Sequence, residues 1–208
     1  MEASAPSAPH IQPEPPTWQP RVLWVSARML CGAATFFFLA FVFAYFYLRS
    51  LDVNQGWKIG QVNPSIGLGV AIVVVLVLSA ALLQLAARRP TQTISLGTGA
   101  LLLALLAVVL QVIEWTTLGF GPASGAYASV FIGWTLMYAV FALPCAYWIE
   151  TQLASGWRTR REGVQRERHE GVPADDVELL AAGLRACAFF WTFYVAVGVV
   201  AFVILYLV

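Results

Sequence analysis

The chain has 208 residues, of which 60% are hydrophobic and only 11% are charged, and its formal net charge is +1 at pH 7. A soluble globular domain carries about 25% charged residues, so this composition, with a mean hydropathy of +0.74, excludes a protein whose whole surface faces water. Uncharged apolar runs of about 20 residues recur, each long enough to cross a hydrocarbon core roughly 30 Å thick, and they predict an all-α membrane protein.

The chain opens with a segment rich in Pro, Ala and Ser, which predicts a disordered tail over residues 1–22. The first apolar run follows a long polar stretch and is too long for the apolar part of a signal peptide, so none is predicted. The remaining residues, 23–208, form the predicted transmembrane domain. None of its apolar segments alternates apolar and polar residues over a long stretch, which favours helices over barrel strands. We place five helices near residues 25–48, 65–88, 94–115, 126–149 and 185–207.

Charged residues concentrate in the predicted loop 150–183. Its RTRREGVQRERHE core is charged on all sides and predicts a solvated hairpin with helical content. The alternatives are contact with anionic lipid or with nucleic acid. We expect no nucleic acid, because Glu162, Glu167 and Glu170 dilute the positive field. Pro173 and the acids after it predict that the last helix begins ahead of its apolar segment.

The distribution of positive charge predicts the orientation. Ten of the 12 Lys and Arg residues fall on the side of the N-terminus, and only Arg49 and Lys58 fall on the other. Because cytoplasmic loops retain positive charge, the N-terminus is predicted to be cytoplasmic and the C-terminus outside. An odd number of helices is consistent with that split.

Histidine is confined to His10 in the tail and His169 in the charged loop, so no predicted helix contains one. This excludes axial histidine ligation of haem inside the bilayer and a histidine-ligated copper centre. Cys31, Cys145 and Cys187 lie in or beside apolar runs without a metal-binding spacing. They are interpreted as small core residues, with disulfides or metal ligation as the alternative. We predict no catalytic, cofactor-binding or metal-binding residue in this chain.

Small residues within the apolar runs predict close helix packing, among them Gly67, Gly69, Gly97 and Gly99. The first run instead contains FFFLAFVFAYFY. These aromatic side chains predict a helix that fills gaps against lipid and neighbouring helices, and the alternative is a lipid- or oxygen-permeable cleft in a larger assembly.

The third apolar run ends in QVIEW, Gln111 to Trp115. A carboxylate is costly inside a bilayer and usually functional there, so the depth of Glu114 matters. Its place at the end of the run predicts an interfacial carboxylate at the outer surface. We expect it to pair with Gln111, one turn back, or with Arg49 or Lys58 across the outer loops. The alternative is a proton or ion relay.

Six residues in and after QVIEW form a pattern in which one helix ends in Gln-x-x-Glu-aromatic and the next begins with Tyr-x-Ser-x-Phe: Gln111, Glu114, Trp115, Tyr127, Ser129 and Phe131. In the last apolar run, Trp191 and Phe193 form a Trp-x-Phe pair. Together with the aromatic stretch FVFAYFYLRS, these motifs resemble the subunit III family of haem–copper terminal oxidases (cytochrome c or quinol oxidase subunit 3). The chain would be a divergent five-helix member that lacks the first two helices of the family, as in bacterial quinol oxidases.

The resemblance implies a non-catalytic accessory subunit of a proton-pumping oxidase, in the aerobic respiratory chain of a bacterial cytoplasmic (inner) membrane. It implies oxidase subunit I, which holds the haems and copper, as the main partner. Subunit II, small subunits or a larger respiratory supercomplex are further partners. No cofactor is expected in this chain, although the family's lipid-binding cleft leaves a bound phospholipid open. The electron donor is not specified, because its site lies on another subunit.

The chain departs from the family at polar positions. The stretch Ala34-Thr35-Phe36 lacks the family's buried glutamate, GWTLMYAVF lacks its histidines, and Thr192 stands where its last helix often has histidine. A small transporter or channel acting as an autonomous oligomer is the alternative function, and a membrane enzyme with its own active site is a third. A transport pathway needs polar groups near the midplane, and the runs offer mainly Thr35, Ser79 and Thr135.

Overall fold

The computed structural model describes residues 19–52, 57–58, 63–166 and 174–208, and every regular element in this part of the chain is helical. The fold consists of the helices α1 (Gln19–Ser50), α2 (Ile66–Arg88), α3 (Thr93–Thr117), α4 (Ala126–Arg166) and α5 (Ala174–Phe202). A 3₁₀ turn, η2 (Pro90–Gln92), joins α2 to α3, and a π-helical turn, η3 (Val203–Leu207), continues α5.

All five of these helices are long and apolar enough to cross a membrane, with spans of 23 to 33 residues, where about 20 suffice. The described chain is therefore an all-α membrane protein, as the composition predicted. A helix pairs its backbone N–H and C=O groups within the segment, which is the condition for crossing hydrocarbon.

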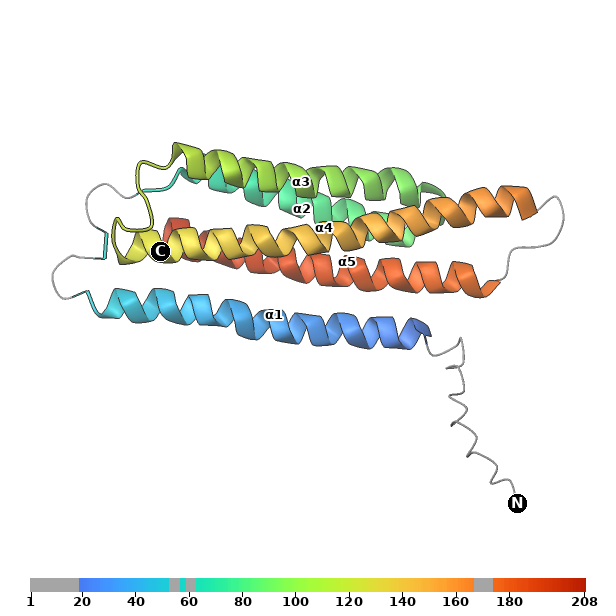
Figure 1. Cartoon of the computed structure of the whole chain (residues 1–208), viewed down its shortest axis with the longest axis horizontal. Coiled ribbons are helices and arrows are strands. Elements are labelled where there is room, and N and C mark those ends of the chain that lie inside the picture. The colour runs from blue at the N-terminus through green and yellow to red at the C-terminus, as the bar shows by residue number, and fades with distance from the viewer. Residues whose placement is uncertain (1–18, 53–56, 59–62, 167–173) are drawn as a thin grey trace, which may run out of the picture.

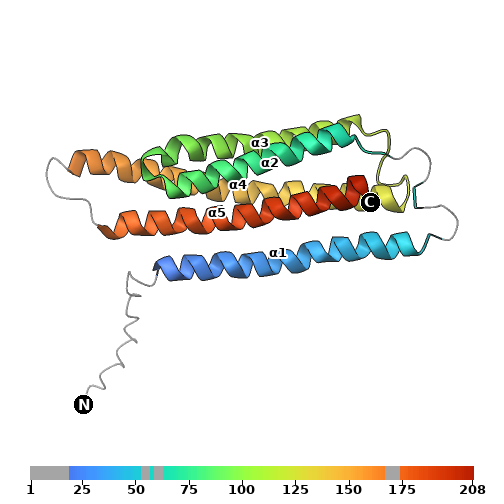
Figure 2. The same ribbon diagram turned by 180° about the vertical axis from the view of Figure 1, so that it is seen from behind.

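The helices lie side by side in an elongated bundle (Figure 1). The hairpin of α2 and α3 forms one side, α4 and α5 lie in the middle, and α1 packs on the other side, against α5 and α4. The view from behind in Figure 2 has the same order. We call the end where α1, α3 and α5 begin the first end of the bundle, and the end that holds the C-terminus the second end.

Small side chains hold α2, α3 and α5 together. Ala100, Ala104 and Ala107 recur at helical spacing on α3 and are at most 4% exposed. The Ser79 hydroxyl of α2 donates to the Ala100 carbonyl (2.7 Å) and accepts from Trp191 Nε1 of α5 (3.0 Å). One buried hydroxyl thus joins three helices, and its hydrogen bonds satisfy a polar group inside the bundle.

Glycine packing is confirmed at two of the four predicted positions and partly at a third. A Cβ on Gly97 would collide with the Leu153 side chain of α4, and one on Gly69 would lie 2.7 Å from Tyr206 Cε1. At Gly99 it would lie 3.3 Å from a methyl group of Leu82. The prediction is wrong for Gly67, where a Cβ would meet only Ser65 of the same helix start.

Several helix ends differ from the expected ones. α1 begins at Gln19, inside the predicted tail, while the tail's first 18 residues lie outside the described part. α4 continues to Arg166 instead of ending near residue 149, and its 41 residues extend roughly 60 Å. The end of α4 was predicted too early because hydropathy shows only where a span leaves the bilayer. The Arg, Glu and Gln residues after that point favour helix, so the helix continues. Most of the predicted loop 150–183 is therefore helical in the described residues.

Candidate functional site

QVIEW lies in the last two turns of α3, where Gln111 and Glu114 are three residues apart and share one face. Gln111 Nε2 donates to Glu114 Oε2 at 2.9 Å, which confirms the predicted pairing. The predicted surface exposure is wrong, because the Glu114 side chain is 0% exposed. The C-terminal turn of the chain and the start of α4 pack over it, so a position at a helix end does not bring it to the surface.

Tyr206, in η3, supplies the second hydrogen bond to this carboxyl group. Its hydroxyl donates to Glu114 Oε2 at 2.6 Å across 92 positions of the sequence. Gly69 of α2 makes room for the tyrosine ring, because any side chain there would collide with it. A π-helical turn changes the direction in which side chains leave the helix. The site thus depends on three helices and on one irregular turn.

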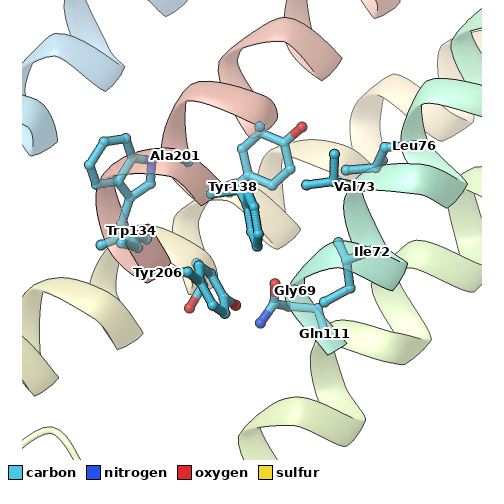
Figure 3. A pocket seen from close by; sticks show the side chains of 13 residues that line it. Gly69, Ile72, Val73, Leu76, Gln111, Trp134, Tyr138, Ala201 and Tyr206 are labelled. Atoms are coloured by element: carbon cyan, nitrogen blue, oxygen red, sulfur yellow. The ribbon is translucent and has the colours of Figure 1, made fainter. Parts of the chain in front are cut away.

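Two polar atoms beside this pair have no hydrogen-bond partner among the described residues: Glu114 Oε1 and Trp134 Nε1. A cavity of about 40 Å³ is lined by Trp134 and by the two hydrogen-bond donors of Glu114, Gln111 and Tyr206, together with Tyr138 and side chains from α2 and α5 (Figure 3). A cavity needs about 10–15 Å³ to hold a water molecule. The cavity can therefore hold a water molecule beside Trp134 and the two donors that bind Glu114.

The two basic residues expected near Glu114 contact other groups. Arg49 Nη1 donates to the Val208 carbonyl (2.9 Å), and the Lys58 ammonium lies 4.4 Å from the centre of the Tyr127 ring. Burial lowers the pKa of Lys58, and the nearby Arg49 guanidinium lowers it further. Within the described part of the chain, Glu114 is therefore held by neutral donors and has no cationic partner.

The Tyr-x-Ser-x-Phe segment begins α4 and packs directly against the same site. The Tyr127 hydroxyl donates to the Leu205 carbonyl at 2.5 Å, next to Tyr206. The Phe131 ring contacts the Tyr206 ring edge to face, with centroids 5.4 Å apart. The Ser129 hydroxyl instead donates to the Pro122 and Gly125 carbonyls and so ties the first turn of α4 to the loop before it.

The other motif residues have separate roles. Trp115 Nε1 donates to the Thr135 hydroxyl at 3.0 Å and ties α3 to α4. Trp191, 1% exposed, binds Ser79 on the α2–α5 side, and Phe193 is half-buried. Trp115 and Trp191 thus join pairs of helices through hydrogen bonds that do not involve Glu114.

Sequence reasoning missed three tyrosines. Tyr138 and Tyr194 stack with centroids 4.3 Å apart, and each hydroxyl donates to the backbone carbonyl of the other residue. Tyr206 completes the Glu114 site. The sequence around a tyrosine in an apolar run does not indicate which group accepts its hydroxyl hydrogen bond, because that acceptor lies on another helix.

Among the described residues there is no cluster of three or more His, Cys, Asp or Glu side chains that could hold a metal ion. The three cysteines are free thiols, two of them buried and Cys31 half-buried. What the Glu114 site can do is hold α3, α4 and the end of α5 together and bind water or a proton within a largely apolar bundle. No family model matches this chain, and no curated protein matches it.

Proposed function

We propose that this chain is a non-catalytic accessory subunit of a proton-pumping haem–copper terminal oxidase, of the subunit III type. In this role it packs on the subunit that holds the haems and copper and stabilises it, in a bacterial cytoplasmic membrane. The observation that carries the proposal is that both halves of the family-like pattern meet the same turn, η3. Glu114 accepts from Tyr206, and Tyr127 donates to Leu205.

These two contacts support the proposal because they give the residues of the family-like pattern one structural role, which is to hold η3 in place. A carboxyl, an amide and two phenol groups fix the mutual position of α3, α4 and α5, and a buried polar network of this kind favours one arrangement of packed helices. Such residues serve packing rather than chemistry on a substrate. That division of labour fits a subunit whose partners carry the redox centres.

The apolar outer face of α1 gives further support. Phe36 is 80% exposed, Met29 73% and Phe43 68%. These side chains are uncovered because α1 packs against α5 and α4 on one of its faces. In the membrane, lipid or a neighbouring subunit has to cover the other face. In the proposed complex this face is available to subunit I or to annular lipid.

The alternative function is a small transporter or channel that acts as an autonomous oligomer. The buried carboxyl group of Glu114 favours it, because an ionisable residue inside a membrane bundle usually marks an ion or proton pathway. Against it, the cavity lined by Gln111 and Tyr206, the two residues that bind Glu114, is only about 40 Å³.

Affinity purification from the native membrane in a mild detergent tests the two against each other. The chain would carry a C-terminal tag, and the visible spectrum and the copurifying proteins would be recorded. We expect haem absorption in fixed ratio to the chain, with larger subunits present. A colourless, homogeneous oligomer of this chain alone would overturn the oxidase proposal and favour the transporter.

A further inference from the structure

Trp134 of α4 carries a buried hydrogen-bond donor that is not paired with any described residue. Its side chain is 1% exposed, and its Nε1 has no partner in the described part of the chain. The indole ring stacks on Phe41 of α1, with centroids 5.9 Å apart and the ring planes at 26° to each other, so packing fixes its place. Because most buried polar atoms are paired with protein or with ordered water, this N–H indicates a partner outside the chain.

Two other tryptophans show how an indole is paired in this bundle. Trp191 is as buried as Trp134, at 1% exposed, and its Nε1 donates to the Ser79 hydroxyl at 3.0 Å. Trp115 Nε1 donates to the Thr135 hydroxyl at the same distance of 3.0 Å. Burial alone therefore does not leave an indole unpaired. Trp134 differs from both because it lines the cavity of about 40 Å³, which neither of the other two does.

The same cavity offers two hydrogen-bond acceptors. Gln111 and Tyr206 line it, and each uses its donor on Glu114 Oε2, so the carboxamide oxygen and the hydroxyl oxygen remain as acceptors. The two side chains lie next to each other because they bind the same oxygen atom (Figure 3). Glu114 itself does not line the cavity. The cavity thus combines one donor from α4 with acceptors from α3 and η3.

A second, smaller cavity of about 20 Å³ adjoins the first and shares Gln111 and Tyr138 with it. The two cavities also share Ile72 and Leu76 of α2, but the rest of the second lining is apolar: Ala107, Val108, Ala139 and Ala142. A buried water molecule needs two to four polar partners, and apolar cavities stay dry. The two neighbouring cavities therefore differ in what they can bind, although their volumes are similar.

We propose that the first cavity binds one ordered water molecule and that the second stays empty. The water accepts a hydrogen bond from Trp134 Nε1 and donates to the carboxamide oxygen of Gln111 and the hydroxyl oxygen of Tyr206. Three hydrogen bonds are typical of a buried water molecule. The water extends the Glu114 network to α4 and, through the stacked ring of Phe41, to the packing of α1. The proposal does not rest on the oxidase proposal, because it uses only the polar groups and the cavities of this chain.

Nuclear magnetic resonance of the purified protein in detergent tests the proposal. With ¹⁵N-labelled tryptophan, magnetisation transfer from water to each indole N–H is measured, and the variants W134F and W191F assign the two buried signals. We expect transfer to the indole of Trp134 and none to that of Trp191, which is equally buried but bonded to a hydroxyl. Absence of transfer to Trp134, or equal transfer to both indoles, would overturn the proposal.

Cavity-filling variants distinguish a bound water from the protons of nearby hydroxyl groups. Ala201 lines the first cavity and Ala139 the second, and each is 8% exposed. Ala201→Val should abolish the transfer to Trp134, because the added methyl groups occupy the space of the water, whereas Ala139→Val should retain it. Val73→Ile, on the α2 wall of the first cavity, takes the place of Ala201→Val if that variant does not fold. Transfer that survives filling of the first cavity would come from a hydroxyl proton, and this result would overturn the proposal, as would an equal loss in Ala139→Val.

Discussion

Glu114 is a carboxyl group without exposed surface, with both of its hydrogen-bond donors on Oε2. Removing an acceptor from a buried network leaves its donors unpaired, and that costs more than the bonds themselves contribute. Without the Glu114 carboxyl group, the Gln111 amide and the Tyr206 hydroxyl would have no acceptor. A substitution of Glu114 therefore acts on the contact between α3 and the end of α5.

Glu114→Ala should reduce the free energy of unfolding by about 2–4 kcal/mol, because two buried donors lose their acceptor and a small cavity forms. Thermal unfolding of the purified protein in detergent, followed by circular dichroism, measures the change. Glu150→Ala is the control, since Glu150 is exposed on α4, and it should change the stability by less than about 0.5 kcal/mol. Similar losses in both variants would show that Glu114 contributes no more than a surface carboxylate.

Glu114→Gln separates the structural role from a proton relay. Glutamine keeps one acceptor oxygen for Gln111 or Tyr206 but cannot take up or release a proton. If the group serves packing, the variant should retain near-normal assembly, and any copurifying oxidase should keep its turnover and proton pumping in vesicles. Normal assembly together with abolished pumping would establish the relay instead.

At the scale of the elements, the contacts between helices depend on where small residues lie. Gly97 allows α3 to approach α4 until Leu153 occupies the space of a missing side chain, and Gly69 does the same for α2 and the ring of Tyr206. In a bilayer this close approach replaces the hydrophobic driving force that acts between helices in water. Nearer the start of α4, which carries Tyr127 and Phe131, the Trp115–Thr135 hydrogen bond joins the same two helices.

Gly97→Ala should destabilise the bundle by about 1–3 kcal/mol, because the added methyl group has no space and the helices must separate. Gly32→Ala on α1 is the matched control, since no atom lies within 4 Å of the added carbon there. The midpoint of thermal unfolding in detergent compares the two. A Gly97→Ala variant as stable as Gly32→Ala would mean that Leu153 turns aside without loss.

At the scale of the whole molecule, five spans place the start of α1 and the end of η3 at opposite ends of the bundle (Figure 1). Positive charge is unequal between the two ends, since among the Lys and Arg residues that the structure describes only Arg49 and Lys58 fall at the second end. Arg21, Arg88 and Arg185, the charged last turns of α4 and the start of α5 all belong to the first end.

We predict that this first end is cytoplasmic, because positively charged loops are retained on that side of the membrane. Fusion of a fluorescent protein to the N-terminus and of alkaline phosphatase to the C-terminus tests the orientation in a bacterial host. The first fusion should fluoresce and the second should be active, since each reporter functions on one side only. The reverse pattern would place the first end on the outer side of the membrane.

The sequence by itself determined the class of the protein and the number of its spans. Apolar runs such as that of α3 are long enough to cross a bilayer, and a chain in hydrocarbon must satisfy its backbone within helices. The pairing of Gln111 with Glu114 was also predictable, because residues three apart share a helix face. The extension of α4 to Arg166 was not, since hydropathy reports the end of a span and not the end of a helix.

Only the tertiary structure decided the surroundings of Glu114. Its burial depends on Tyr206, 92 positions later, and on the rotation of each helix about its axis. Helices that are apolar on all sides carry no stripe from which that rotation can be read. For the same reason the sequence did not predict that Arg21, Arg88 and Arg185, on three different helices, line one groove, because they meet only when those helices pack.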